Sequence, residues 1–160
     1  MVSMMILTMM ILISIMNINY FKQPTGNTCG PACLKMVHSS IFTLQDTLQI
    51  TIEDIADMCG TDWVVGTPPD RMEEGLKALG LEYVIHVGEE NPFESLHKTI
   101  DDGSTPILRT LTREMPHWII VESYVGCIYN VLDPWLGRIQ YTEEELTKIW
   151  EVRDFFYFEI

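Results

Sequence analysis

The sequence predicts an α+β fold, with helices concentrated in the first half of the chain and strands in the second half. Helix-start patterns and apolar residues at helical spacing occupy much of residues 29–101. Runs rich in β-branched and aromatic residues concentrate after residue 104. Two of these runs are separated only by Val125-Gly126, a connection typical of an antiparallel hairpin. Such segregation of helices and strands favours an α+β fold over a wound parallel sheet.

The size and composition are those of one folded domain. The chain has 160 residues, of which 47% are hydrophobic and 10% are aromatic. That length supports one hydrophobic core and is short for two domains. The apolar fraction excludes an intrinsically disordered chain. We therefore expect a single domain over residues 17–160.

The first expected helix begins at Cys29. Ala32, Cys33, Met36 and Val37 recur at helical spacing and give the helix an apolar face. A proline in the first turn, at the position two residues after the cysteine, costs no hydrogen bond because N–H groups there have no helical acceptor. The sequence therefore places Cys29 at a helix N-terminus.

Four further helices are predicted from residues that commonly cap helix N-termini. Their starts lie at Thr51-x-x-Asp54, Thr67-Pro68-Pro69-Asp70, Asn91-Pro92 and Thr142-x-x-Glu145. In each case we expect the Thr or Asn side chain to cap a helix with an apolar face. The helix after Thr51 is expected to bury Ile55, Ala56 and Met58 and to end at Gly60.

Five strands are expected from runs of β-forming residues. They lie at 82–87, 105–111, 118–124, 127–132 and 152–158. The last run ends in consecutive aromatic residues, which predicts a core strand that closes the sheet. Cys127 falls within the fourth run, and we expect its side chain to be packed.

The charge of the chain is strongly acidic. There are 10 Lys and Arg residues against 23 Asp and Glu residues, a net charge of −13. This surface repels phosphate backbones and anionic lipids, so we expect no nucleic-acid partner. We attribute the acidity to solubility in preference to recruitment of a basic partner.

The first sixteen residues form an apolar segment with no charged side chain. Residues 1–16 lack the basic region and small-residue cleavage site of a secretory signal, and they are shorter than the roughly twenty residues of a membrane span. We interpret residues 1–16 as a misplaced start or a packed apolar tail. A membrane anchor or an export signal is the alternative, which would change the expected cytoplasmic location.

The four cysteines are interpreted as reduced thiols. A core of this size needs no disulfides, and no paired C-x-x-C zinc pattern is present. The chain also has neither a Gly-rich phosphate loop nor an HExxH helix, so we expect no metal and no organic cofactor. Reduced thiols raise the question of whether one cysteine is a nucleophile.

The segment from Gln23 to Cys33 is the first candidate for catalytic chemistry. A cysteine at a helix N-terminus lies near unpaired N–H groups and the positive end of the helix dipole, which favour the nucleophilic thiolate. The side-chain amide of Gln23, a few residues upstream, is a suitable donor to an oxyanion. A buried structural cysteine would show the same local pattern.

His117 and Asp133 form the second candidate group. His117 precedes one strand of the expected hairpin, and Asp133 follows the other. Antiparallel pairing brings these ends together, so the Asp133 carboxylate can hold the imidazole through Nδ1–H. An oriented His117 could then accept the Cys29 proton.

The other histidines are weaker candidates for the general base. His97 is expected on the apolar side of its helix as a structural residue. His38 and His86 have no carboxylate at an informative spacing. Cys33, one turn after Cys29, is most simply a small core residue.

These motifs together resemble the C39-like cysteine peptidases, papain-like enzymes related to the double-glycine leader peptidases of bacteriocin export. The resemblance runs from about Tyr20 to the C-terminus. It rests on the order Gln23, Cys29-Gly-Pro-Ala, His117-Trp-Ile-Ile-Val and Asp133-Pro-x-x-Gly.

The resemblance implies a papain-like fold with the nucleophile helix packed against an antiparallel sheet. It also implies that Cys29 is the nucleophile, His117 the general base and then acid, Asp133 the orienting residue, and Gln23 the oxyanion donor. The substrate would be a peptide or protein. The bond cleaved would be of Gly-Gly or isopeptide type, and cleavage would pass through an acyl-thioester intermediate.

Two departures separate this chain from transporter-linked members of that family. Those members often carry Asp before the cysteine, where this chain has Thr28, and no ATPase or transmembrane bundle follows the domain. We therefore expect a stand-alone peptidase. A catalytically silent peptide-binding module and a transglutaminase-like acyl transferase are the alternatives.

Overall fold

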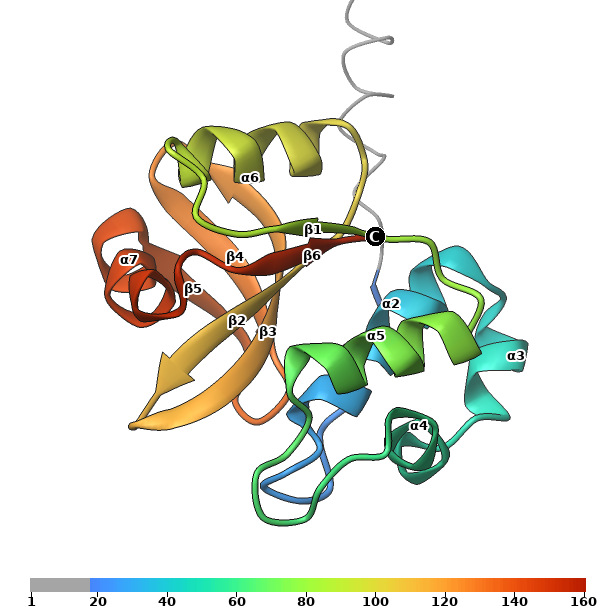
Figure 1. Ribbon diagram of the computed structural model, residues 1–160. Coiled ribbons are helices and arrows are strands. Elements are labelled where there is room, and N and C mark those ends of the chain that lie inside the picture. Colours follow the sequence, from blue (N-terminus) through green and yellow to red (C-terminus); the bar gives the residue numbers. More distant parts are fainter. Residues whose placement is uncertain (1–17) are drawn as a thin grey trace, which may run out of the picture.

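The computed structural model describes residues 18–160 (Figure 1). The apolar segment 1–16, whose interpretation as a misplaced start or packed tail stays a prediction, lies outside the described residues. No helix within residues 18–160 is both long enough and apolar enough to cross a membrane.

Helices dominate the first half of the fold and strands the second half, as the sequence predicts. The helices are α2 (Cys29–Ile41), α3 (Leu44–Leu48), α4 (Ile52–Cys59), α5 (Pro69–Ala78), α6 (Pro92–Asp101), α7 (Glu143–Trp150) and the 3₁₀ helix η1 (Glu151–Arg153). The strands are β1 (Val84–His86), β2 (Pro106–Thr112), β3 (Met115–Val125), β4 (Ile128–Asp133), β5 (Gly137–Thr142) and β6 (Tyr157–Glu159).

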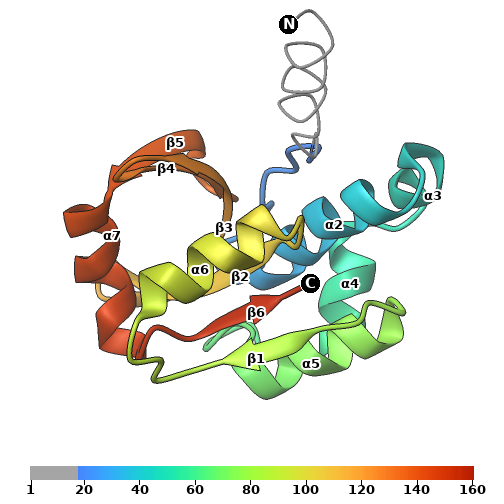
Figure 2. The same cartoon turned by 90° about the horizontal axis from the view of Figure 1, so that it is seen from above.

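The six strands form one antiparallel sheet in the order β1-β6-β2-β3-β4-β5. The last strand, β6, inserts between β1 and β2, so its aromatic residues Tyr157 and Phe158 are fully buried. Seen from above, the sheet curls so that β4 and β5 turn back toward α7 (Figure 2). The C-terminal core strand is therefore confirmed, although it pairs on both sides and does not form an edge.

Two hydrophobic cores lie on opposite faces of this sheet. On β3, Trp118 and Ile120 belong to the core that also contains residues of α2, α4 and α5, whereas Ile119 and Val121 belong to the core that contains residues of α6 and α7. This alternation follows from the period of two in a strand. The helical first half is thus packed on the antiparallel sheet, with α2 in contact with β3.

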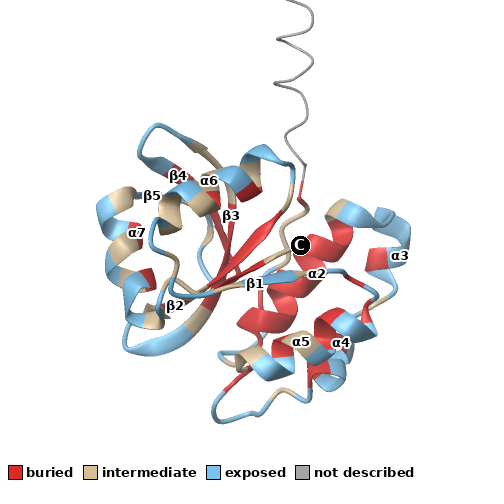
Figure 3. Ribbon diagram, turned by 45° about the horizontal axis from the view of Figure 1, so that its top comes forward, coloured by how far each residue is buried: buried red, intermediate tan, exposed pale blue. Residues whose placement is uncertain are grey.

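Helix α2 is buried along almost its whole length (Figure 3). Gly30 permits this close packing, since a Cβ atom there would lie 2.7 Å from the Met72 sulfur and 3.2 Å from Cδ1 of Trp118. Neighbouring helices and the sheet thereby fix the N-terminus of α2 in position.

Two of the four predicted N-caps are confirmed. Thr51 and Thr142 each form a capping box with the acidic residue three positions later. The predictions for Thr67 and Asn91 were wrong, because neither side chain forms a capping hydrogen bond at its helix start. Thr67 instead hydrogen-bonds Thr61 through its side chain and accepts a bond from Trp118 through its carbonyl.

Several other local predictions were wrong. Met58 is 41% exposed because it lies outside the face of α4 that meets α2 and α5. Cys127 is exposed in the β3–β4 turn and is not packed within a strand. The run 152–158 begins as a 3₁₀ helix, with positive φ at Asp154 and Phe155, and only its end is a strand. Helix α3 and strand β5 were not predicted from the sequence.

Candidate active site

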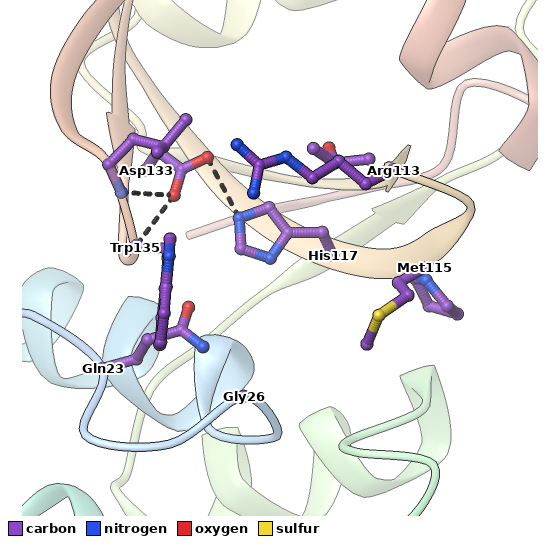
Figure 4. A pocket seen from close by; sticks show the side chains of 10 residues that line it. Gln23, Gly26, Arg113, Met115, His117, Asp133 and Trp135 are labelled. Carbon is purple, nitrogen blue, oxygen red and sulfur yellow. Dashed lines mark hydrogen bonds and ion pairs between the residues drawn. The ribbon is translucent and has the colours of Figure 1, made fainter.

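The β3–β4 hairpin brings His117 and Asp133 together. His117 lies near the start of β3 and Asp133 is the last residue of β4. Nε2 of His117 lies 3.0 Å from Oδ2 of Asp133, and both side chains are shielded, with exposed fractions of 13% and 1%. The expected contact through Nδ1 was wrong, because the ring is turned so that Nε2 faces the carboxylate (Figure 4).

The Asp133 carboxylate is held by three donors. Its Oδ1 accepts hydrogen bonds from the backbone N–H groups of Trp135 at 2.7 Å and Leu136 at 3.0 Å, while Oδ2 faces His117. Burial alone would raise the pKa of this carboxyl, but the bonds from His117 and the two N–H groups lower it. Asp133 is therefore an ionised, fixed partner for the imidazole.

Cys29 occupies the N-terminus of α2, where no side chain caps the first turn. The Thr28 side chain turns away from the helix and bonds Thr25, which closes the preceding loop. The N–H groups of the first turn therefore remain available to stabilise a negative charge beside Cys29. The cysteine itself is 5% exposed.

The Cys29 thiol lies close enough to His117 to influence its protonation. Burial lowers the pKa of His117, but the hydrogen bond to Asp133 and the nearby Asp133 and Cys29 groups outweigh burial. The resulting pKa is about 9. The imidazole is therefore positioned between a thiol and a carboxylate, and both neighbours favour its protonated form.

Gln23 lies beside this group on the loop before α2. Its backbone N–H donates to Pro134 O at 2.9 Å, which ties the loop to the turn after β4. Its side-chain Nε2 donates to Thr25 O at 2.6 Å, and its Oε1 is buried without a hydrogen-bond partner among the described residues. An amide nitrogen carries two hydrogens, so Nε2 has a second donor available.

A pocket opens directly beside these side chains (Figure 4). Its lining includes three of the four predicted site residues and the tip of the β2–β3 hairpin: Gln23, Gly26, Thr112, Arg113, Met115, Pro116, His117, Asp133, Trp135 and Leu136. Cys29 does not line it. The structure thus brings Gln23, His117 and Asp133 to one pocket, and Cys29 lies near His117 outside the pocket lining.

The remaining histidines and cysteines lie outside this group. His97 bonds the Tyr129 hydroxyl at 2.8 Å, the structural role that its sequence position predicts. His86 contacts two carboxylates, those of Glu89 and Glu159, contrary to the prediction that it has no informative carboxylate partner. Cys33 is fully buried, and burial raises the pKa of its thiol well above the usual value.

Sequence reasoning missed the contribution of the β2–β3 hairpin to the site. Arg113 and Met115 line the pocket because strands β2 and β3 pair to the end of the hairpin, at Thr112 and Met115. The alternation of the two strands indicates pairing, but the intervening Arg113-Glu114 lacks the Asn or Gly typical of a two-residue turn. Within residues 18–160, no cluster of three His, Cys, Asp or Glu side chains has a metal-binding arrangement.

Comparisons with known proteins agree on one family. The sequence profile of the Peptidase C39 family matches residues 17–154. The fold is similar to the peptidase domain of Streptococcus ComA, a bifunctional ABC transporter involved in a quorum-sensing pathway, with a TM-score of 0.69, 16% identity, and coverage of 88% of this chain and 96% of that chain. The search of curated proteins found no match.

Two further solved structures share the fold. A double glycine motif protease from an AMS/PCAT transporter, in complex with the leader peptide, has a TM-score of 0.70, 18% identity, and coverage of 89% of this chain and 90% of that chain. The peptidase domain of Streptococcus mutans ComA has a TM-score of 0.62, 16% identity, and coverage of 87% of this chain and 95% of that chain. The predicted papain-like α+β fold is thereby confirmed.

Proposed function

Because this chain belongs to the peptidase C39 family, and is therefore a cysteine peptidase, we propose that it hydrolyses peptide bonds with Cys29, His117 and Asp133 as a catalytic triad. The observation that carries this proposal is the position of His117, between the Asp133 carboxylate and the Cys29 thiol. A thiol, an imidazole and a carboxylate that interact in this order form the arrangement that activates a thiol as a nucleophile.

The proposed reaction begins with transfer of the Cys29 proton to His117. The thiolate attacks the carbonyl carbon, and the C–N bond breaks as His117 gives its proton to the departing amine. A water molecule, deprotonated by His117, then attacks the acyl-thioester and releases the acid and the thiol. Asp133 acts through His117, since its charge stabilises the imidazolium in both steps.

The oxyanion that forms on the carbonyl needs donors on the Cys29 side of the site. We assign this role to the second Nε2 hydrogen of Gln23 and to the backbone N–H of Cys29. The bond from Gln23 to Thr25 fixes the amide orientation before substrate arrives. Loss of one such donor costs about 10²–10³-fold in kcat.

A narrow approach to the thiol favours glycine on the acyl side of the cleaved bond. Cys29 is only 5% exposed, so little room is left for a side chain beside its thiol. The relative crystallised with its leader peptide is a double glycine motif protease. We therefore propose a peptide substrate with Gly-Gly before the cleaved bond.

Iodoacetamide labelling of the folded protein tests the proposed nucleophile. Cys127 is exposed and Cys29 is nearly buried, so accessibility alone predicts faster labelling of Cys127. We expect the opposite order at neutral pH, because thiolate formation governs alkylation. Mass spectrometry quantifies both sites in one sample, and Cys127→Ser is the matched control. Slower labelling of Cys29 than of Cys127 would contradict the proposal.

Cleavage assays separate hydrolysis from the alternatives. Cys29→Ala should abolish cleavage of Gly-Gly peptides that the original protein cuts, whereas Cys127→Ser should not. Product masses with and without an added primary amine distinguish hydrolysis from acyl transfer. Cleavage by the Cys29→Ala protein would exclude the proposed triad.

A further inference from the structure

The pocket beside His117 has apolar walls and one arginine. Met115, Pro116, Trp135 and Leu136 supply the apolar side chains, and Arg113 is the only Arg or Lys among the lining residues. Lys22 lies nearby, with its Nζ 5.7 Å from the centre of the Trp135 ring, but it does not line the pocket. Figure 4 shows the Arg113 side chain extending across the pocket toward the His117–Asp133 pair.

Arg113 has no ion-pair partner among residues 18–160. Asp133 is the only carboxylate among the lining residues, and its two oxygens are already engaged by His117 and by backbone N–H groups. The guanidinium therefore keeps its five donors for a ligand.

The backbone fixes where this charge lies. Arg113 and Glu114 form a two-residue turn with φ values of 51° and 63°, and β2 and β3 pair up to Thr112 and Met115 on either side. His117 lies on the same hairpin, paired with Thr110. The distance from the imidazole to the base of the Arg113 side chain is thus set by a paired hairpin and not by a loose loop.

The proposed chemistry determines which part of a substrate enters this pocket. His117 gives its proton to the departing amine, so the segment that carries this amine must pass His117. The acyl segment, in contrast, remains bonded to Cys29, which lies outside the pocket lining. The pocket between His117 and Arg113 therefore receives the leaving segment.

We propose that Arg113 recognises a carboxylate in the leaving segment of the substrate. The carboxylate belongs either to an Asp or Glu side chain shortly after the cleaved bond or to the C-terminus of a short leaving segment. Trp135 and Met115, which line the same pocket, would lie beside the part of the substrate that joins this carboxylate to the cleaved bond. This proposal rests on the proposed function, because the role of His117 assigns the pocket to the leaving side.

Binding to a catalytically inactive protein tests the proposal without cleavage. The probes are fluorescent peptides that contain Gly-Gly and carry either Glu or Gln within the first three positions after the second glycine. Each is made with a free or an amidated C-terminus and is otherwise identical. Affinities are measured by fluorescence anisotropy on Cys29→Ala, on Cys29→Ala/Arg113→Gln and on Cys29→Ala/Arg113→Lys. Cys29→Ala/Lys98→Gln is the charge-matched control, since Lys98 lies on α6 outside the pocket lining.

We expect the Cys29→Ala protein to prefer a carboxylate peptide over its neutral counterpart by about two- to fivefold, because Arg113 is exposed and an exposed ion pair contributes up to about fivefold. The preference should weaken with added salt. It should disappear with Arg113→Gln and persist with Arg113→Lys and with Lys98→Gln. A preference for Glu identifies a side-chain carboxylate, whereas a preference for the free terminus identifies the C-terminal carboxylate.

Two outcomes would overturn the inference about Arg113. One is equal binding of all four probes to the Cys29→Ala protein, and the other is a preference that survives Arg113→Gln. Both leave the proposed function intact if the original protein still cleaves Gly-Gly peptides and Cys29→Ala does not. Conversely, if the original protein cleaves none of the peptides but the Arg113-dependent preference is preserved, the proposed Gly-Gly hydrolysis is contradicted. The carboxylate site is then kept without its assignment to the leaving segment.

Discussion

Nε2 of His117 faces Oδ2 of Asp133 at 3.0 Å, which leaves Nδ1 as the ring nitrogen available to Cys29. The two oxygens of Asp133 have separate tasks, since Oδ1 accepts the N–H groups of Trp135 and Leu136. One oxygen thus fixes the carboxylate to the chain, and the other fixes the imidazole. The orientation of the proposed base depends on both.

We predict that Asp133→Asn lowers kcat/KM by about 10- to 1000-fold, because an amide has one acceptor oxygen where the carboxylate has two. The asparagine must then lose either the bond to His117 or the bonds from the turn, and it carries no charge to stabilise the imidazolium. Steady-state kinetics on a cleaved peptide measure the effect.

Asp62→Asn is the matched control for this substitution. Asp62 Oδ1 accepts two backbone N–H groups, from Val64 and Val65, in the same manner as Asp133, but Asp62 has no histidine partner among residues 18–160. We expect this variant to keep activity within about twofold of the original protein, since its single acceptor oxygen remains. An equal loss of activity in both variants would show that turn geometry, and not the imidazole, carries the effect.

The pKa of His117 predicts how activity falls at alkaline pH. Asp133 and Cys29 raise it from 6.5 to about 9. The imidazolium that protonates the leaving amine is therefore lost as the pH rises through about 9. We expect kcat/KM to fall near this pH, and to fall at a lower pH in Asp133→Asn. A pH profile from about pH 6 to pH 10 measures both. Activity that still increases above pH 9 would contradict the assignment.

The same shift predicts a pH-dependent contribution to stability. The folded pKa of His117 lies above its unfolded value, so protonated His117 stabilises the fold fully below about pH 6.5, and this contribution is lost as the pH rises through about 9. Denaturant unfolding at several pH values measures the loss. His117→Gln should remove this part of the pH dependence.

The sequence was sufficient to predict the pairing of His117 with Asp133 because a short hairpin connection and antiparallel pairing constrain which residues meet. It could not predict which ring nitrogen faces the carboxylate. That choice depends on the rotamer of His117, which is set by neighbouring packing and not by spacing along the chain.

The missed elements have physical causes as well. Strand β5 reads Gly-Arg-Ile-Gln-Tyr-Thr, an alternation of polar and apolar residues that indicates a half-buried strand, so this signal was present in the sequence. The failed cap at Thr67 had no such signal, because Thr61 and Trp118 recruit Thr67 only in the folded protein. Arg113 lines the pocket because β2 and β3 pair up to the turn that contains it. This turn has no Asn or Gly, so nothing in the sequence indicated a tight hairpin at this position.

We predict that Gly30→Ala destabilises the protein, because the new Cβ would lie 2.7 Å from the Met72 sulfur and 3.1 Å from Thr67 Cβ. Overpacking of this kind costs about 1–3 kcal/mol, and each kcal/mol lowers Tm by about 2–4 °C in a domain of this size. Gly26→Ala is the control, since no atom lies within 4 Å of its Cβ position. We expect its Tm to stay within about 1 °C of the original value. Equal Tm values for both variants would show that the contact of α2 with Met72 and Thr67 relaxes without cost, and that Gly30 is not needed for the close packing that positions Cys29.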